Sequence, residues 1–211
     1  MVFQLYADPI TVNCHKVLAA LKHIGADYKM IYVDYLAQQQ KLPGYLRINP
    51  NGTIPAAVHN DLIITESNAI MQYAADISGD KGAEVYPKDL RQRALINSWL
   101  FWEAFGWFRS NYVYLVENVM KPLRAQPPDE AALADEQPRW LALANVLNSQ
   151  LGKTKYMIGD TVTIADFAVM APMHMHTLQK LPLDGLPHLK RWIADMDRVH
   201  AWRSTSAFIV E

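Results

Sequence analysis

The chain has 211 residues but a single cysteine, Cys14, which excludes an intrachain disulfide and a zinc site built from several cysteines. No apolar run approaches the roughly 18–20 residues that span a bilayer. The first ten residues lack the basic and apolar regions of a secretory signal. Twenty basic residues balance 21 acidic ones, so no broad surface for nucleic acid or anionic membrane is expected. We therefore expect a globular, cytoplasmic protein that binds neither nucleic acid nor membrane.

What the chain does contain is typical of packed domains. Hydrophobic residues make up 51% and charged residues 19%, and this length holds one large or two small domains. The hydrophobic periodicity switches repeatedly over residues 1–78, whereas almost all of the rest has helical spacing. We predict an α/β domain over 1–78, a linker over 79–88 and an all-helical domain over 89–211.

The first domain is expected to follow the order β-α-β-α-β-β-α. The long connection between the first two strands favours a parallel pair, and the short connection between the last two favours a hairpin. Together they predict a four-stranded mixed sheet. The strands are expected at 2–6, 28–33, 54–58 and 62–65, and the helices at 12–24, 37–48 and 66–77.

The second domain begins with one long helical pattern, at 90–120, that is unusually rich in aromatic residues. Pro138 is expected to kink or divide the next helix, because proline removes a backbone donor. The remaining predicted helices are 130–151, 163–180 and 187–196.

Three short segments of the first domain carry residues suited to ligand binding. Most X-Pro bonds are trans, so Ile54-Pro55 taken alone indicates an ordinary turn. If the bond is cis, the backbone N–H and C=O of Ile54 turn outward, where they can pair with a peptide-like ligand.

The other two segments lie at helix starts. Ser67 is a plausible N-cap, and Glu66 also belongs to that helix end. A ligand carboxylate would be attracted to the same place, while Glu66 would pair with a ligand ammonium. Thr11 and Asn13 are either caps or hydrogen-bond donors to an anion at the first helix.

With these three segments in this order, the chain resembles the cytosolic glutathione transferases over essentially its whole length. The resemblance is strongest at 48–56 (INPNGTIPA), 65–75 (TESNAIMQYAA) and 161–167 (TVTIADF). It implies a thioredoxin-like N-terminal domain followed by an all-α domain. The nu class and the related yeast prion-like branch look most similar, and the phi class is next. In 161–167 the family places a capping box, which makes Asp166 a folding residue rather than a catalytic one.

The resemblance implies that glutathione is the co-substrate, with no metal. Thr11 and Asn13 would donate hydrogen bonds to its thiolate. The backbone of Ile54, held by cis-Pro55, would pair with its cysteinyl unit. The remaining implied contacts are Glu66 and Ser67 for the γ-glutamyl end, and Gln40, Lys41 and, to a smaller degree, Thr53 for the glycyl carboxylate.

The second substrate would be a small hydrophobic electrophile or a disulfide. Ile10, Trp102, Phe105 and Tyr112 are candidates for its pocket, although aromatic residues at helical spacing also suit a core or a subunit interface. The family and the aromatic helix together imply a homodimer.

Two other residue groups are discounted. Cys14 lies near a helix start, but free cysteine is commonly buried, and the family members that use a cysteine place it at the position of Val12. His174 and His176 point to different sides of a helix and have no further ligand nearby, so no metal site is expected.

These observations favour an enzyme in which a glutathione thiolate attacks an electrophile, as in detoxification, or a disulfide, as in a disulfide reductase. The alternative is a non-catalytic, glutathione-binding regulatory protein of the same fold.

Overall fold

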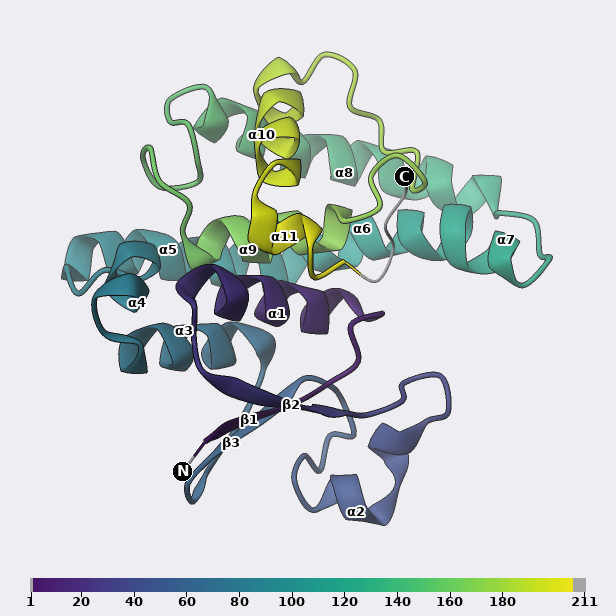
Figure 1. The fold of residues 1–211 in the computed structure, drawn as a ribbon. Helices are drawn as coiled ribbons and strands as arrows, with labels where there is room; N and C mark the ends of the chain where they lie inside the picture. Colours follow the sequence, from purple (N-terminus) through teal and green to yellow (C-terminus); the bar gives the residue numbers. More distant parts are fainter. Residues whose placement is uncertain (1, 207–211) are drawn as a thin grey trace. The chain divides into compact units, whose positions relative to one another are not determined.

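A computed structural model describes residues 2–206 of the chain (Figure 1). The described residues divide into two compact units. The first runs to Lys88 and resumes at Asp197, and the second covers Asp89–Met196. The predicted tail extends to Glu211, and its last five residues lie outside the described part.

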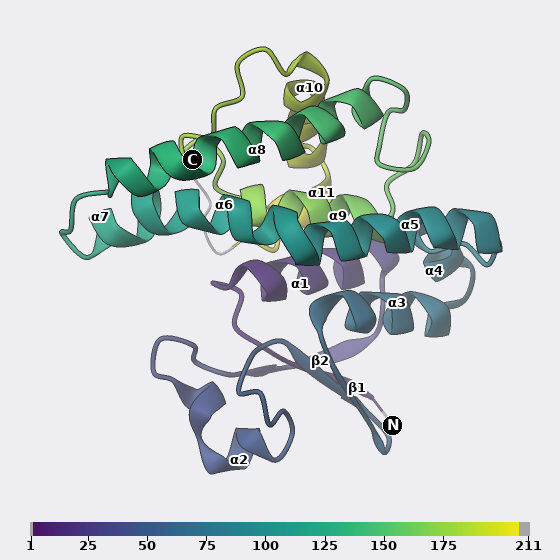
Figure 2. The same cartoon turned by 180° about the vertical axis from the view of Figure 1, so that it is seen from behind.

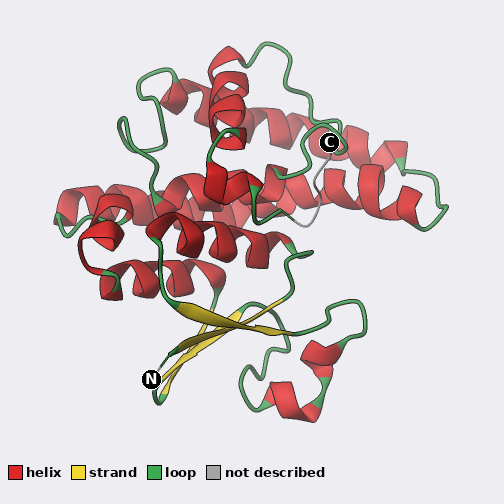
Figure 3. Ribbon diagram, viewed as in Figure 1, coloured by secondary structure: helices red, strands yellow, loops and turns green. Residues whose placement is uncertain are grey.

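The first unit contains the predicted four-stranded mixed sheet, in the order β2-β1-β3-β4. β1 (Phe3–Ala7) pairs in parallel with β2 (Tyr28–Tyr32) and antiparallel with β3 (Ala56–His59). β3 and β4 (Leu62–Thr65) form the predicted hairpin. All the strands of the described chain belong to this unit (Figure 3).

Two helices lie side by side over one face of this sheet, as Figures 1 and 2 both show. α1 (Val12–Ile24) has the predicted bounds, and it ends at Gly25, whose φ of 69° allows its N–H to reach the carbonyls of Leu21 and Lys22. α3 (Ser67–Ile77) starts one residue later than predicted. Both helices bury an apolar stripe, which fixes their starts and ends relative to the sheet.

The predicted helix over 37–48 is wrong. The structure has a 3₁₀ turn, η1 (Gln39–Lys41), followed by the single-turn α2 (Pro43–Leu46), on the other side of the sheet from α1 and α3 (Figure 1). Pro43 cannot donate the backbone hydrogen bond that a continuous helix needs, but it suits a helix start. The chain therefore turns twice before it reaches Asn49.

The segment predicted as a linker, 79–88, differs in the structure. It holds a helix, α4 (Gly79–Val85), that packs on α3 within the first unit. The packing is close because Gly82 has no side chain: a Cβ there would lie 1.8 Å from the carbonyl oxygen of Ala75. The first unit also includes α11 (His200–Arg203), which packs on α1.

The second unit begins with one uninterrupted run of helical segments over the range predicted as a long helix. Two short stretches of the run are π-helical, a rare geometry that occurs mostly as single turns inside α-helices. α8 (Glu130–Leu151) lies alongside α6, and it passes through Pro138 undivided (Figure 2). The segments are α5 (Leu90–Trp102), η2 (Glu103–Trp107), α6 (Phe108–Leu115), η3 (Val116–Met120) and α7 (Lys121–Leu123).

The predicted helix over 163–180 is shorter in the structure. α9 (Ile164–Met170) gives way to the 3₁₀ turn η4 (Ala171–Met173), because Pro172 cannot donate to the preceding turn. α10 (Pro187–Asp197) follows after a stretch of turns, and it is one residue longer than predicted.

Three fully buried tryptophans organise the core of the second unit. Each indole N–H donates a hydrogen bond: Trp107 to the carbonyl of Val169 at 3.0 Å, Trp140 to Asn111 at 2.9 Å and Trp192 to Asp166 at 2.9 Å. Buried indole groups need such partners. Part of the aromatic content of the long helix is therefore structural.

Candidate functional site

The start of α1 leaves several hydrogen-bond donors available. Thr11 is the N-cap residue and accepts a hydrogen bond from the N–H of Cys14 at 3.4 Å. Its own hydroxyl donates to the carbonyl of the buried Asp8 at 3.2 Å. Within the described residues, the N–H groups of Val12 and Asn13 have no acceptor. Such N–H groups, together with the helix dipole, attract an anion.

Asn13 connects this helix start to that of α3. The hydroxyl of Ser67 donates to Asn13 Oδ1 at 3.4 Å, so the amide oxygen faces α3. No described residue accepts a hydrogen bond from Asn13 Nδ2. The side-chain amide is thus held by its oxygen while its donor end remains available.

Glu66 occupies the N-cap position of α3 with a φ of 68°, and its exposed side chain makes no capping hydrogen bond. Ser67 was the expected N-cap, but it is the first helical residue, and the side chain of neither residue caps α3. A non-glycine residue at such a φ costs about 1–3 kcal/mol, and residues of this kind cluster at functional sites.

The bond between Ile54 and Pro55 is cis, so the ordinary-turn interpretation was wrong and the form implied by the resemblance is present. Ile54 is 8% exposed, and no described residue pairs with its backbone N–H or C=O. Buried backbone groups are nearly always paired in proteins, so the N–H and C=O of Ile54 are two unused pairing groups next to the cis bond.

A clamp that the sequence analysis missed holds the residue before Ile54. The carbonyl of Thr53 accepts hydrogen bonds from Tyr45 Oη at 2.7 Å and from Asn49 Nδ2 at 2.8 Å. Asn49 is fully buried and also donates to Thr53 Oγ1 at 3.1 Å. Residues 49–52 (NPNG) have the composition of a turn, but nothing in that pattern indicates that the side chain of Asn49 reaches Thr53.

Gln40 and Lys41 lie against the same loop. Gln40 O and Lys41 Nζ would be 3.2 Å and 2.9 Å from a Cβ placed on Gly52, whose φ is 59°. Gln40 is 2% exposed, and its Oε1 has no hydrogen-bond partner among the described residues. The structure therefore places these two residues against Gly52, which precedes Thr53 in the chain.

The four candidates for an electrophile pocket divide between the units. Ile10 belongs to the first unit, where its N–H donates to Asp8 Oδ1 at 3.1 Å. In the second unit Trp102 stacks on Trp107, with ring centroids 5.5 Å apart. Phe105 is 90% exposed, whereas Tyr112 is 39% exposed and stacks on a neighbouring ring, that of Phe108.

Comparison with known proteins decides the family. Models of the glutathione S-transferase N-terminal and C-terminal domains match residues 1–76 and 112–198. A glutathione S-transferase of Hyoscyamus muticus is 30% identical over 204 residues, which is 96% of each chain. The chain belongs to the glutathione S-transferase family. Its fold is accordingly the expected one, a thioredoxin-like domain followed by an all-α domain.

Two further relatives of this transferase are plant proteins. Glutathione S-transferase F13 of Arabidopsis thaliana is 29% identical over 199 residues, covering 93% of this chain and 91% of that one. The crystal structure of glutathione transferase F7 from Populus trichocarpa superposes with a TM-score of 0.87 at 26% identity, covering 97% of both chains. The F series is the phi class, so these relatives do not support the expected similarity to the nu class and the yeast prion-like branch.

The single cysteine of this transferase is buried, as predicted. Cys14 is fully inaccessible, and burial raises the pKa of its thiol to about 12, although a hydrogen bond with Thr11 acts in the opposite direction. The thiolate is the reactive form of cysteine, so Cys14 is not a nucleophile at neutral pH.

Asp166 has the structural role expected of it. It forms the capping box of α9 with Thr163, and its carboxylate also accepts from the N–H of Met157. Within residues 2–206 no three His, Cys, Asp or Glu side chains gather as a metal site would require. The same residues include no helix that is long and apolar enough to cross a membrane.

Proposed function

We propose that this transferase binds glutathione on its first unit and stabilises the thiolate at the start of α1. The observation that carries the proposal is the set of available donors there: two backbone N–H groups and Asn13 Nδ2. Conjugation requires the thiolate, because the neutral thiol is a poor nucleophile. The enzyme therefore needs no general base if the thiol ionises on binding.

These groups can supply the free energy needed to lower the pKa of the glutathione thiol. Lowering a thiol pKa from about 8.5 to about 6.5 takes roughly 2.7 kcal/mol. One hydrogen bond to a charged group contributes about 1.5–3 kcal/mol, and a helix N-terminus adds about 0.3–1 kcal/mol. We assign the main donor role to Asn13, because the hydroxyl proton of Thr11 already lies on the carbonyl of Asp8. Thr11 then acts first as the residue that fixes the helix start, and it donates to the thiolate only if that bond is exchanged.

The rest of glutathione would lie along the other candidate residues. Ile54 would pair with the cysteinyl backbone through its N–H and C=O, next to cis-Pro55. The γ-glutamyl ammonium would bind Glu66, and its carboxylate would bind Ser67 and the start of α3. The buried amide of Gln40 and the ammonium of Lys41 would face the glycyl carboxylate, beside Thr53.

The same thiolate would serve two kinds of second substrate. With an electrophile, the glutathione sulfur forms the new bond and the leaving group departs. With a disulfide, it bonds to one sulfur and the other sulfur leaves as a thiolate, giving a mixed disulfide. Because Cys14 is buried and protonated, the attacking sulfur in either reaction is that of glutathione.

The class and assembly are also part of the proposal. We assign the chain to the phi class, acting in the cytoplasm as a homodimer that needs no metal. Three side chains of the long helix support a dimer, because they leave large apolar groups in solvent: Leu90 is 82% exposed, Phe101 75% and Phe105 90%. Trp102 and Tyr112 are then better candidates than Phe105 for the contacts that the second unit makes with the electrophile, and Ile10 stays the candidate of the first unit.

An ultraviolet titration of bound glutathione tests the proposal. The thiolate absorbance should appear well below the pKa of the free thiol in the wild type, and at higher pH in Asn13→Ala. Thr163→Ala is the matched control, since it removes the N-cap threonine of α9 instead, and its titration should equal that of the wild type. Saturable binding with an unshifted thiol would refute activation at α1.

A further inference from the structure

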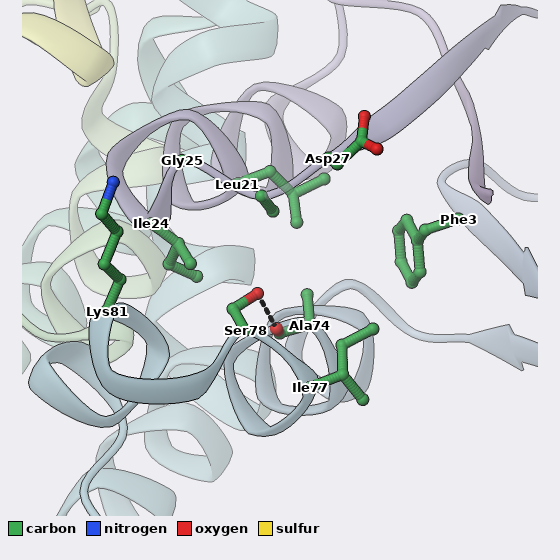
Figure 4. A pocket seen from close by; sticks show the side chains of 10 residues that line it. Phe3, Leu21, Ile24, Gly25, Asp27, Ala74, Ile77, Ser78 and Lys81 are labelled. Carbon is green, nitrogen blue, oxygen red and sulfur yellow. Dashed lines mark hydrogen bonds between the residues drawn. The ribbon is translucent and has the colours of Figure 1, made fainter.

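A pocket lies in the first unit, where α1 and α3 end (Figure 4). The proposed glutathione contacts lie at the starts of the same two helices. It has a volume of about 230 Å³. Its apolar walls are Phe3 of β1, Leu21 and Ile24 of α1, and Ala74 and Ile77 of α3. At 1.5 Å of rise per residue, Leu21 is about 15 Å along the helix from Thr11.

The polar groups of this pocket gather around its rim. The hydroxyl of Ser78 donates to the carbonyl of Ala74 at 2.6 Å, so its proton is not available to a ligand. Lys81 extends from α4 toward the end of α1, and its Nζ would be 3.4 Å from a Cβ on Gly25. Asp27 stands at the other end of the pocket (Figure 4).

Lys81 makes its own end of the pocket positive, and the carboxylate of Asp27 lies at the opposite end. No described residue forms an ion pair or hydrogen bond with its ammonium group. The last carbonyls of α1, at Leu21 and Lys22, accept instead from the N–H of Gly25. Lys81 is exposed, and its ammonium stands at the rim of a pocket with apolar walls with all three donors available, which favours a carboxylate whose attached group is apolar.

The size of the pocket limits the ligand. Sites for drug-sized molecules occupy about 300–1,000 Å³, so this pocket suits a single ring or a short chain. We propose that it binds a small monocarboxylate, with the carboxylate on Lys81 and the apolar body between Ile24, Ile77 and Phe3. This site is separate from the glutathione site and would be occupied whether or not glutathione is bound.

The probe for this proposal is 4-phenylbutyrate, added to the full chain in saturating glutathione while its backbone amide NMR signals are followed. The amides of Gly25, Ala26 and Ser78 should shift in a saturable manner. Lys81→Met should weaken binding about fivefold, the loss expected for one partly exposed ion pair. Lys22→Met is the matched control, because it removes the same charge from the last turn of α1 outside the pocket, and it should bind as the wild type does.

Two further measurements keep the test decisive. The uncharged 4-phenylbutan-1-ol should bind the wild type more weakly than the acid does, and Lys81→Met should not change its affinity. Ile77→Ala, at a half-exposed position on the rim, should weaken both ligands. Shifts confined to other amides, no saturable shift at all, or equal losses in Lys81→Met and Lys22→Met would overturn the proposal.

Discussion

The helix starts of this transferase fall into two kinds. At the start of α9, Thr163 donates to Asp166 from both its N–H and its hydroxyl, and the other oxygen of Asp166 accepts from Met157 and Trp192. Both helices leave their first two N–H groups without an acceptor among the described residues, but at the start of α1 the donor end of the Asn13 side chain is unpaired as well, so this start is open. Both helices have a threonine N-cap, so the residue type of the cap does not distinguish the structural start from the start that we propose to bind glutathione. The unpaired side-chain amide of Asn13 does distinguish them.

The start of α9 is closed, in that its side chains are paired with one another. Breaking these pairs should lower the stability of the fold more than a change at the start of α1 or α3 does. Asp166→Ala would leave four buried donor groups without an acceptor, and we expect a loss of about 3–5 kcal/mol in the free energy of unfolding. Urea unfolding measures this loss. Asp184→Ala, which removes an exposed carboxylate paired with Lys190, should leave the unfolding midpoint nearly unchanged. Similar midpoints for the two variants would contradict the comparison.

The side chains at the start of α3 do not cap the helix, so this start is also open. A substitution there should weaken glutathione binding and increase the stability of the fold. Glu66→Gly removes the proposed partner of the γ-glutamyl ammonium, so the KM for glutathione should rise by an amount equivalent to about 1.5–3 kcal/mol. The same change relieves a φ of 68° at residue 66 and should stabilise the fold by about 1 kcal/mol. Steady-state kinetics and urea unfolding test the two parts. An unchanged KM would place the γ-glutamyl end elsewhere.

At the open start of α1, Asn13→Ala should change the chemistry more than the binding. We expect the pKa of bound glutathione to rise by about one unit, which corresponds to about 1.4 kcal/mol. Below that pKa, kcat should fall about tenfold while the KM for glutathione changes little. Thr11→Ala should cost about 1 kcal/mol of stability as a lost cap, with a smaller effect on kcat. Equal changes in kcat and affinity for Asn13→Ala would reduce its role to binding.

The smallest predicted effect is a pH dependence of stability that arises from His15, on the buried side of α1. The ring of His15 packs at a tilt against that of Trp202 of α11, with ring centroids 4.1 Å apart, and burial lowers the pKa of His15 below the ordinary value of 6.5. As the pH falls, the unfolded chain therefore takes up the proton before the folded chain does. The contribution of neutral His15 to stability is fully present above pH 6.5 and is lost as the pH falls below it. The slope for one proton cannot exceed about 1.4 kcal/mol per pH unit.

Urea unfolding at several pH values checks this prediction when the wild type is compared with His15→Gln. The difference between the two free energies should vary below pH 6.5 and stay constant above it. A constant difference over the whole range would show that His15 does not titrate with folding.

The contrast between helix starts explains which parts could be predicted from sequence. The bounds of α1 and the capping box of α9 depend on residues three or four positions apart, so they are visible in the sequence itself. The sequence signal against the predicted helix over 37–48 was also local, because Pro43 and Gly44 stand in the middle of that range. The prediction gave more weight to a loose apolar pattern.

What could not be predicted depends on contacts between distant segments or on backbone angles. The bond between Ser67 and Asn13 joins two helices, and neither residue alone indicates which end of the amide stays available. The φ of Glu66 has no signal in its residue type. The clamp on Thr53 needs Tyr45 from α2, an element that the periodicity placed inside a longer helix.

The burial of Cys14 has a practical consequence for studying this chain. The sequence has one thiol, and in the folded protein that thiol is fully covered and protonated at neutral pH. A cysteine introduced at an exposed position would therefore be the only one to react with a maleimide dye. Two such cysteines, one in each unit, would carry a donor and an acceptor fluorophore without prior removal of the native residue. The distance between the units could then be followed in solution as substrates bind.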